Sequence, residues 1–267
     1  MEKINLRDIN FEKLKRLQQQ GSKSIVYTDG TYCYKILTDY DEIEKQRIYE
    51  KFFYMENLKL DNVLLPKGMI VEDGILQGYI MDYFQNSTTL LSRFARRKFN
   101  CKELFEYVYK ASIVLRNIHK SGIVWQDLSF ENILVNDNKN VMFCDIDGCS
   151  YNGINSPYYS MLLANFMFKF RRTKIKDFVE LDKLSMILSF YNTLYCQVLQ
   201  RITKKQYHVL SDNISTLETL RPIANMLIDK NCPIERLPYL DEVINLSDDF
   251  EIDRKKVMTL RQMIFKI

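Results

Sequence analysis

The sequence predicts an α+β protein in which a strand-rich first part is followed by a mainly helical second part. Strand patterns separated by turn residues dominate up to residue 84 and are interrupted by one helical stretch. After a polar segment at 85–89, apolar residues recur at helical spacing instead. The 267 residues, 46% hydrophobic and 27% charged, suffice for a folded protein with a large core. We therefore divide the chain into residues 1–84 and residues 85–267.

Two pairs of strands are predicted in the first part. Residues 24–28 and 31–37 flank Asp29-Gly30, a dipeptide that favours the positive φ angles of a tight hairpin turn. Residues 63–71 and 75–84 form a second apolar pair, separated by Glu-Asp-Gly. The first part is therefore expected to be a sheet.

One helix is predicted between these pairs, over residues 39–58. The stretch contains neither Gly nor Pro and mixes charged with apolar side chains. Thr38, Asp39 and Asp41 are its N-cap candidates, because a side-chain oxygen at that position accepts a hydrogen bond from an otherwise unpaired backbone N–H.

The second part is predicted to be helical, apart from one short hairpin. The hairpin comprises residues 133–135 and 141–144, which surround the turn-forming residues 136–140. Helical spacing of apolar residues is found in four segments: 102–120, 178–199, 217–229 and 254–266.

Three polar residues stand at the margins of that hairpin. Asp127 and Asn132 precede its first strand, and Asp145 follows its second strand, thirteen residues after Asn132. Phosphoryl transfer needs a residue that orients the acceptor hydroxyl and oxygen ligands for Mg²⁺. The order and spacing of the three residues therefore predict a phosphoryl-transfer site.

Over roughly residues 14–200 the chain resembles the protein-kinase-like superfamily, which includes protein kinases and small-molecule phosphotransferases. The catalytic loop H-R-D-x-x-x-x-N of that family is matched by Trp125-Gln-Asp-Leu-Ser-Phe-Glu-Asn132, with its Asp and Asn retained. The motif D-F-G is matched by Asp145-Ile146, but Asp147 stands where the glycine would be. The resemblance implies a two-lobed fold, with an antiparallel sheet and one helix in an N-lobe at 1–84 and a mainly helical C-lobe at 85–267.

The resemblance also implies roles for these residues. Asp127 would orient the acceptor hydroxyl, and Asn132 and Asp145 would bind Mg²⁺. Asp147 is an alternative metal ligand at this stage. Asp182 resembles the helical residue that anchors the catalytic loop.

A lysine–glutamate pair is expected on the N-lobe side. Lys35 corresponds to the strand lysine that holds the α- and β-phosphates. Its partner should be a glutamate of the helix, and counting back from residues 62–66 selects Glu50. Glu44 is the alternative.

The resemblance places the nucleotide between the lobes. Of the family's glycine-rich loop only Gly21 is retained. Met81 takes the gatekeeper place, and the backbone of Asp82 and Phe84 would face the adenine edge. The apolar walls around the ring would be Val26, Cys33 and Leu134.

Some features depart from familiar protein kinases. The segment after Asp145 lacks an A-P-E ending, and Ser129 replaces the lysine that helps neutralise the transferred phosphoryl group in protein-serine kinases. Gln126 replaces the loop arginine that usually pairs with an activation-segment phosphate. An activation-segment phosphate is therefore not expected to be needed.

The implied function is ATP- and Mg²⁺-dependent phosphoryl transfer to a hydroxyl acceptor, with protein serine or threonine as the first choice. The alternatives are a small-molecule kinase of the aminoglycoside or choline phosphotransferase type and a nucleotide-binding pseudokinase that serves as a binding module. The sequence leaves the acceptor and the oligomeric state open.

Bulk composition predicts a cytoplasmic protein. The formal net charge of +4 predicts no specific nucleic-acid partner. Six cysteines without a C-x-x-C pair fit a reduced chain, and the charged first twenty residues are unlike a secretory signal. No run of 18 apolar residues predicts a transmembrane segment.

Overall fold

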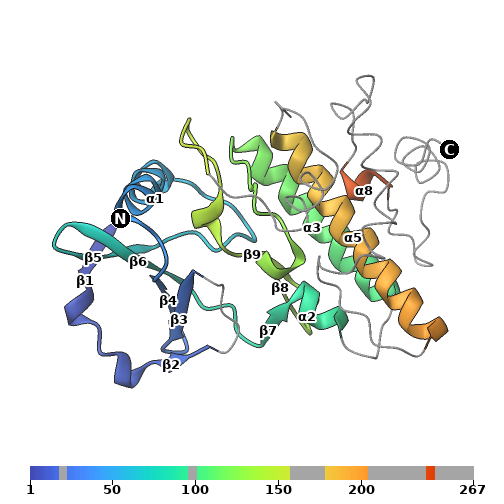
Figure 1. Ribbon diagram of the computed structural model, residues 1–267, viewed down its shortest axis with the longest axis horizontal. Coiled ribbons are helices and arrows are strands. Elements are labelled where there is room, and N and C mark those ends of the chain that lie inside the picture. Colours follow the sequence, from blue (N-terminus) through green and yellow to red (C-terminus); the bar gives the residue numbers. More distant parts are fainter. Residues whose placement is uncertain (18–22, 96–100, 157–177, 204–238, 244–267) are drawn as a thin grey trace.

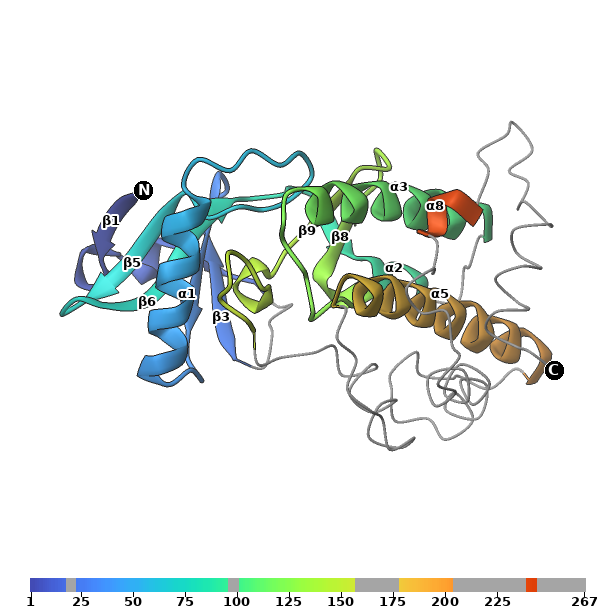
Figure 2. The same cartoon turned by 90° about the horizontal axis from the view of Figure 1, so that it is seen from above.

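The computed structural model describes residues 1–17, 23–95, 101–156, 178–203 and 239–243. The helices predicted at 217–229 and 254–266 lie outside these residues. Among the described residues, a sheet with one helix lies at one end of the molecule and a group of helices at the other, in both views of the ribbon (Figures 1 and 2). The predicted α+β class is confirmed.

A six-stranded sheet forms the N-terminal end, in the order β1-β5-β6-β4-β3-β2. Neighbouring strands are antiparallel except for β1 and β5, which run parallel. The strands are β1 (Glu2–Asn5), β2 (Lys15–Arg16), β3 (Ser24–Thr28), β4 (Tyr32–Leu37), β5 (Gly68–Glu72) and β6 (Ile75–Asp82). Two short 3-10 turns, Leu6–Asp8 and Phe11–Lys13, connect β1 to β2.

The predicted hairpin is formed by β3 and β4. Gly30 has a φ of 95°, the left-handed conformation that glycine adopts without a steric penalty. The Asp29 carboxylate accepts hydrogen bonds from the backbone of Thr31 and Tyr32, which closes the turn. The register pairs Val26 with Lys35, so that this turn fixes where Lys35 lies in the sheet.

The predicted helix is α1 (Glu42–Met55), which is shorter than expected at both ends. Of the three N-cap candidates, Asp41 is the cap: its side chain accepts from the backbone N–H of Glu44, whose carboxylate accepts from the backbone N–H of Asp41. The buried face of the helix comprises Ile48, Lys51, Phe52 and Met55. It packs on the sheet, mainly on β6, and α1 crosses β5 and β6 in Figure 2.

The remaining described elements form the second part. The helices are α2 (Leu90–Ala95), α3 (Cys101–Lys120), α5 (Phe178–Thr203) and α8 (Leu240–Val243). A three-stranded antiparallel sheet of β7 (Ser87–Thr89), β8 (Ile133–Asn136) and β9 (Val141–Phe143) lies between these helices and the large sheet (Figures 1 and 2). The predicted 133–144 hairpin is thus confirmed as β8 and β9. The 3-10 turns Phe130–Asn132 and Ile146–Gly148 precede β8 and follow β9.

One predicted strand is mostly a connection between the two parts. Of residues 63–71 only the last four belong to β5, because Pro66 has no N–H to donate to a sheet. The residues at the start of the predicted strand instead pair with β9. The Leu64 N–H donates to the Phe143 carbonyl at 2.8 Å, and the Phe143 N–H donates to the Asn62 carbonyl at 2.8 Å. The sequence did not predict β1 or β7, which are short and lack an apolar run.

Apolar side chains from both parts form the core. Phe52 and Tyr79 contact each other under the large sheet, and Trp125 meets Phe143 edge-to-face with ring centroids 5.2 Å apart. The helices of the described residues include none that is both long and apolar enough to cross a bilayer.

Gly78 of β6 lies tightly against the backbone of β4. A Cβ atom placed there would lie 2.2 Å from the backbone oxygen of Lys35 on β4. We expect Gly78→Ala to lower the free energy of unfolding by about 1–3 kcal/mol, since the strand carrying Lys35 must shift. Urea denaturation followed by circular dichroism measures this.

Gly68→Ala of β5 is the matched control. Its added Cβ would lie 3.6 Å from the Glu2 backbone oxygen, which is an ordinary van der Waals contact. An equal loss of stability in both variants would contradict the role given to Gly78.

Candidate active site

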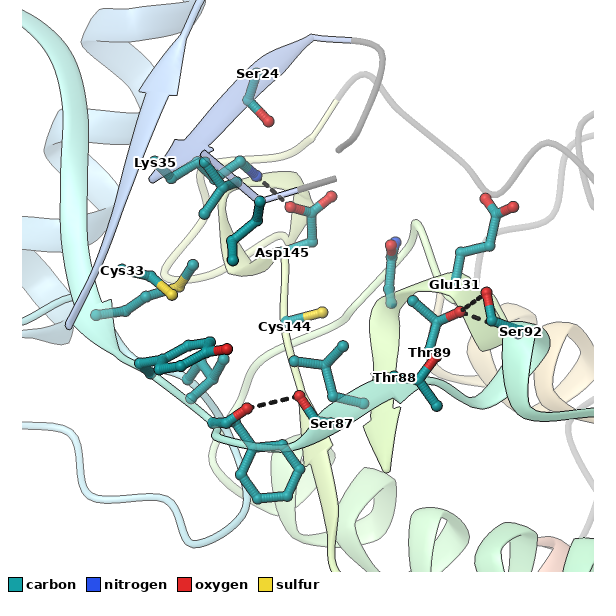
Figure 3. Close-up of a pocket in the computed structure, with 18 of the residues that line it drawn as sticks. Ser24, Cys33, Lys35, Ser87, Thr88, Thr89, Ser92, Glu131, Cys144 and Asp145 are labelled. Atoms are coloured by element: carbon teal, nitrogen blue, oxygen red, sulfur yellow. Dashed lines mark hydrogen bonds and ion pairs between the residues drawn. The ribbon is translucent and has the colours of Figure 1, made fainter. Parts of the chain in front are cut away.

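A cavity of about 870 Å³ lies between the large sheet and the β7–β9 sheet (Figure 3). Its size falls in the range of small-molecule sites. The lining comes from strands β2, β3 and β4, the end of β6, the β7–α2 segment and the β8–β9 region. The cavity therefore combines groups from both parts of the chain.

Most of the predicted site residues meet in this cavity. Lys35 and Asp145 point toward one another in Figure 3, where a dashed line marks their ion pair. The predicted residues that line it are Val26, Cys33, Lys35, Met81, Phe84, Asn132, Leu134 and Asp145.

Gly21 falls outside the described residues. Asp127 is not among the residues that line the cavity. Asp82 does not line the cavity: its carboxylate forms an exposed ion pair with Lys67 at 2.6 Å. Tyr83 lines the cavity instead, and its N–H donates to the Thr31 carbonyl at 2.9 Å.

Several lining residues were missed by the sequence analysis. Tyr83 could have been found, because residues two apart on a strand share a face and Met81 had been identified. Leu64 lies in the connection misread as strand. The rest have no motif of their own: Lys15, Arg16, Leu17, Ser24, Ser87, Thr88, Thr89, Ser92, Glu131 and Cys144.

Lys35 lies at the base of the cavity with 3% of its surface exposed. Its Nζ forms an ion pair with the Asp145 carboxylate and a second with Asp147 Oδ1 at 2.6 Å. Burial alone would lower the pKa of Lys35, but the two nearby carboxylates raise the pKa above its ordinary value. The lysine is therefore held as a cation.

Asp147 is buried where Asp145 is not. The Asp145 side chain is 37% exposed, whereas that of Asp147 is 1% exposed. Burial acts to raise the pKa of Asp147, but the Lys35 charge and hydrogen bonds from Lys35, Tyr79 and Tyr40 overcome it and lower the pKa to about 2. Asp147 is therefore a fixed anion behind the cavity.

The predicted Lys35–Glu50 pair is wrong. Glu50 is exposed, and its carboxylate accepts a hydrogen bond from Gln46 Nε2 at 3.0 Å on the same helix. The alternative, Glu44, contributes its carboxylate to the cap at Asp41. The reason is helical phase, because the residue that α1 directs inward is the next one along, Lys51.

Lys51 joins α1 to the segment after β9. It is 2% exposed, and its Nζ donates to the backbone carbonyls of Asp147 and Cys149, both at 2.6 Å. Burial lowers the pKa of its ammonium group.

The catalytic loop brings Asp127 and Asn132 together. Asn132 Nδ2 donates to the Asp127 backbone oxygen at 2.7 Å. Since the nitrogen of the amide is used in this way, its Oδ1 is the atom suited to a cation. Burial, followed by the charge of Asp145, raises the pKa of Asp127 to about 6.

Asp182 of α5 anchors this loop. It is fully buried and accepts from the backbone N–H groups of Trp125 at 2.6 Å and Gln126 at 2.8 Å. Its Oδ2 also meets His119 Nε2 at 2.9 Å. The carboxylate thus pairs buried backbone donors of the loop that carries Asp127.

Gln126 connects the loop to the segment beyond Asp147. Its φ of 60° is unusual for a residue with a side chain. The amide oxygen accepts from the Ser150 hydroxyl and from the Ser156 N–H, the latter at 3.2 Å. A neutral side chain therefore links the catalytic loop to the segment after Asp147 through hydrogen bonds.

The fold and the site define a protein-kinase-like molecule: a strand lysine, a catalytic loop and an aspartate after a hairpin converge on one cavity between a sheet lobe and a helical lobe. The family model of protein tyrosine and serine/threonine kinases matches residues 27–170, just over half of the chain. The chain belongs to that family.

Similar curated proteins carry kinase names. Protein kinase C of Aspergillus fumigatus is 21% identical over 143 residues, which cover 54% of this chain and 13% of that protein. The serine/threonine-protein kinase OXI1 of Arabidopsis thaliana is 28% identical over 93 residues, 33% of this chain and 22% of that protein. The chain thus spans less than a quarter of either relative.

Removing the Asp182 anchor tests whether it supports the catalytic loop. Asp182→Ala leaves the N–H groups of Trp125 and Gln126 buried without a partner. We expect the free energy of unfolding to fall by about 3 kcal/mol. Chemical denaturation of both proteins measures the difference.

Asp137→Ala is the control for this variant. It removes a carboxylate that is 84% exposed and pairs with Arg93, so we expect a loss below about 1 kcal/mol. Similar losses in the two variants would contradict the anchor.

Proposed function

We propose that the protein catalyses ATP- and Mg²⁺-dependent phosphoryl transfer to a hydroxyl group, with protein serine or threonine as the acceptor. The observation that supports this most directly is the convergence of Lys35, Asp145 and Asn132 on one cavity, with Asp127 hydrogen-bonded to Asn132. Such a site supplies positioning and charge stabilisation, which are the main requirements of phosphoryl transfer.

The residues present fit a magnesium ion. Mg²⁺ prefers oxygen ligands, and Asn132 Oδ1 and the partly exposed Asp145 carboxylate are such ligands. When bound, Mg²⁺ neutralises charge on the phosphate oxygens. Asp147 is a poor ligand, because its side chain is 1% exposed and its oxygens already accept three hydrogen bonds.

The cavity also fits a nucleotide. Apolar side chains on both sides of it can enclose a flat ring: Val26 and Cys33 from the large sheet, and Leu134 from β8. Lys35 lies at the same cavity with a fixed positive charge suited to phosphates. The adenine and phosphate ends would thus be recognised by different chemistry.

Asp127 would orient the acceptor hydroxyl and take its proton. Its pKa of about 6 lies closer to neutral pH than that of an ordinary carboxylate, which suits a general base. The hydrogen bond from Asn132 holds the backbone of Asp127. Gly148 lies next to Asp127: a Cβ atom added at Gly148 would lie 3.5 Å from the Cβ of Asp127, an ordinary van der Waals contact.

A small-molecule acceptor is the second candidate, favoured by Ser129. This residue stands where protein-serine kinases carry lysine, and its hydroxyl accepts from the Glu131 N–H at 3.3 Å, within the loop itself. Incubation with γ-labelled ATP and Mg²⁺ against protein and metabolite panels separates the two. Label on protein supports the first candidate, and label on a metabolite the second.

We also propose a cytoplasmic location. The cysteines whose state is described, Cys33, Cys144 and Cys149, are free thiols, as suits a reducing compartment. Fractionation of cells that express the tagged chain tests this.

Asp127→Asn separates turnover from nucleotide binding. The amide keeps size and hydrogen bonding but cannot accept the proton, so we expect the rate to fall at least about 100-fold. ATP affinity should change little, because Asp127 is not expected to touch ATP. Unchanged activity in a labelled-phosphate assay would refute this mechanism, and ATP binding without transfer by the wild-type protein would favour a binding module.

Asp145→Asn tests the metal site. The measurement is ATP affinity by calorimetry with and without Mg²⁺, which isolates the increment that the metal adds. We expect Asp145→Asn to remove most of that increment, because one of two ligands loses its charge. Asp147→Asn should retain much more of it, and loss of the increment in Asp147→Asn alone would reverse the assignment.

A further inference from the structure

Asp147, which stands at the glycine position of the D-F-G motif, accepts hydrogen bonds from three side chains. Its Oδ1 accepts from Lys35 Nζ at 2.6 Å and from the Tyr79 hydroxyl at 2.7 Å, and its Oδ2 accepts from the Tyr40 hydroxyl at 2.9 Å. All three donors come from the N-terminal part, 68 to 112 residues away in sequence. The side chain thus reaches out of the second part into the first.

Helix α1 faces this carboxylate with a cation instead of an anion. Lys51 is the charged residue of the buried face of α1, and it donates to the backbone oxygen of Asp147. The glutamates considered from the sequence, Glu44 and Glu50, make other bonds at the helix surface. The helix therefore supplies a lysine where the expected pair has a glutamate, and the carboxylate that meets Lys35 comes from Asp147 instead.

We propose that Asp147 is the positioning residue that directs Lys35 toward the nucleotide phosphates, and that Lys51 holds Asp147 in place through its backbone. The proposal rests on the proposed function, since it assumes that the cavity takes ATP. Asp147 acts through Lys35 and not on the substrate, because the Asp147 side chain is buried behind the lysine.

The arrangement changes what holds the site together. In the expected pair, a helix that moves would carry the partner of Lys35 with it. Here the partner lies two residues beyond Asp145, in the short turn Ile146–Gly148. Asp145 has a φ of 79°, and the carboxylates of Asp145 and Asp147 both pair with the same ammonium group. The position of Lys35 is thereby tied to the metal-site segment itself.

Nucleotide titration tests the proposal separately from catalysis. Asp147→Asn and the control Glu50→Gln each remove one negative charge, but only the first touches Lys35. Adenosine lacks the phosphates that Lys35 would hold. We expect Asp147→Asn to weaken ATP binding at least about tenfold while adenosine affinity stays within about twofold, and Glu50→Gln to change neither.

Three milder variants extend the test if Asp147→Asn does not fold. Tyr40→Phe and Tyr79→Phe remove one hydrogen bond to Asp147 each, and Lys51→Met keeps most of the side-chain packing but removes both hydrogen bonds that Lys51 Nζ donates to the backbone. We expect each variant to lower the ratio of ATP affinity to adenosine affinity by about two- to tenfold, as Asp147→Asn does. The buffer carries the same Mg²⁺ concentration throughout.

The outcomes separate the two proposals. Wild-type protein that prefers ATP to adenosine and loses this preference in these variants supports the role of Asp147, whether or not it transfers phosphate. Equal ratios in wild type, Asp147→Asn and the milder variants overturn that role, even in an active kinase. Wild-type protein with no preference for ATP overturns it as well, whereas absence of transfer to any acceptor refutes the proposed function alone.

Discussion

The buried charge of Lys35 is the constraint on which the rest of the site depends. An ammonium group with 3% exposure on a central strand is tolerated only beside anions, since burial of an unpaired charge costs several kcal/mol. Its two carboxylates lie 110 and 112 residues further along the chain. The large sheet can therefore bury this lysine only when the segment after β9 packs against the sheet. Packing of that segment on the sheet also forms one side of the cavity.

The same docking segment, together with the strand β9 that precedes it, is held by three other parts of the chain. Lys51 bonds its backbone from α1, Gln126 bonds Ser150 from the catalytic loop, and the connection before β5 pairs with β9 through Leu64. Two residues near it, Gln126 and Asp145, have positive φ angles despite their side chains. Backbone strain of this kind persists where surrounding contacts over-determine it, as Asp182 and Lys35 do here. The strain is thus part of how the site is positioned.

Local chemistry made much of this architecture predictable. The hairpin follows from Asp29-Gly30, α1 from its cap at Asp41, and β8 and β9 from apolar runs around turn residues. The spacing of Asp127, Asn132 and Asp145 indicated one site, because these residues flank a single hairpin. Strands β1 and β7 escaped prediction, since short strands without apolar runs form only when a partner edge is in place.

The sequence by itself determined the fold class and the family, and it indicated candidate residues for one site, because turn, cap and motif signals act over a few neighbouring residues. Only the tertiary structure decided which carboxylates pair with Lys35. A choice of Glu50 needs only a count along the chain, but the pairing depends on the rotational phase of α1 and on a segment more than a hundred residues away. One step along the helix turns a side chain by about 100°, which places Lys51 inside and Glu50 in solvent, and leaves Asp145 and Asp147 as the counter-ions of Lys35.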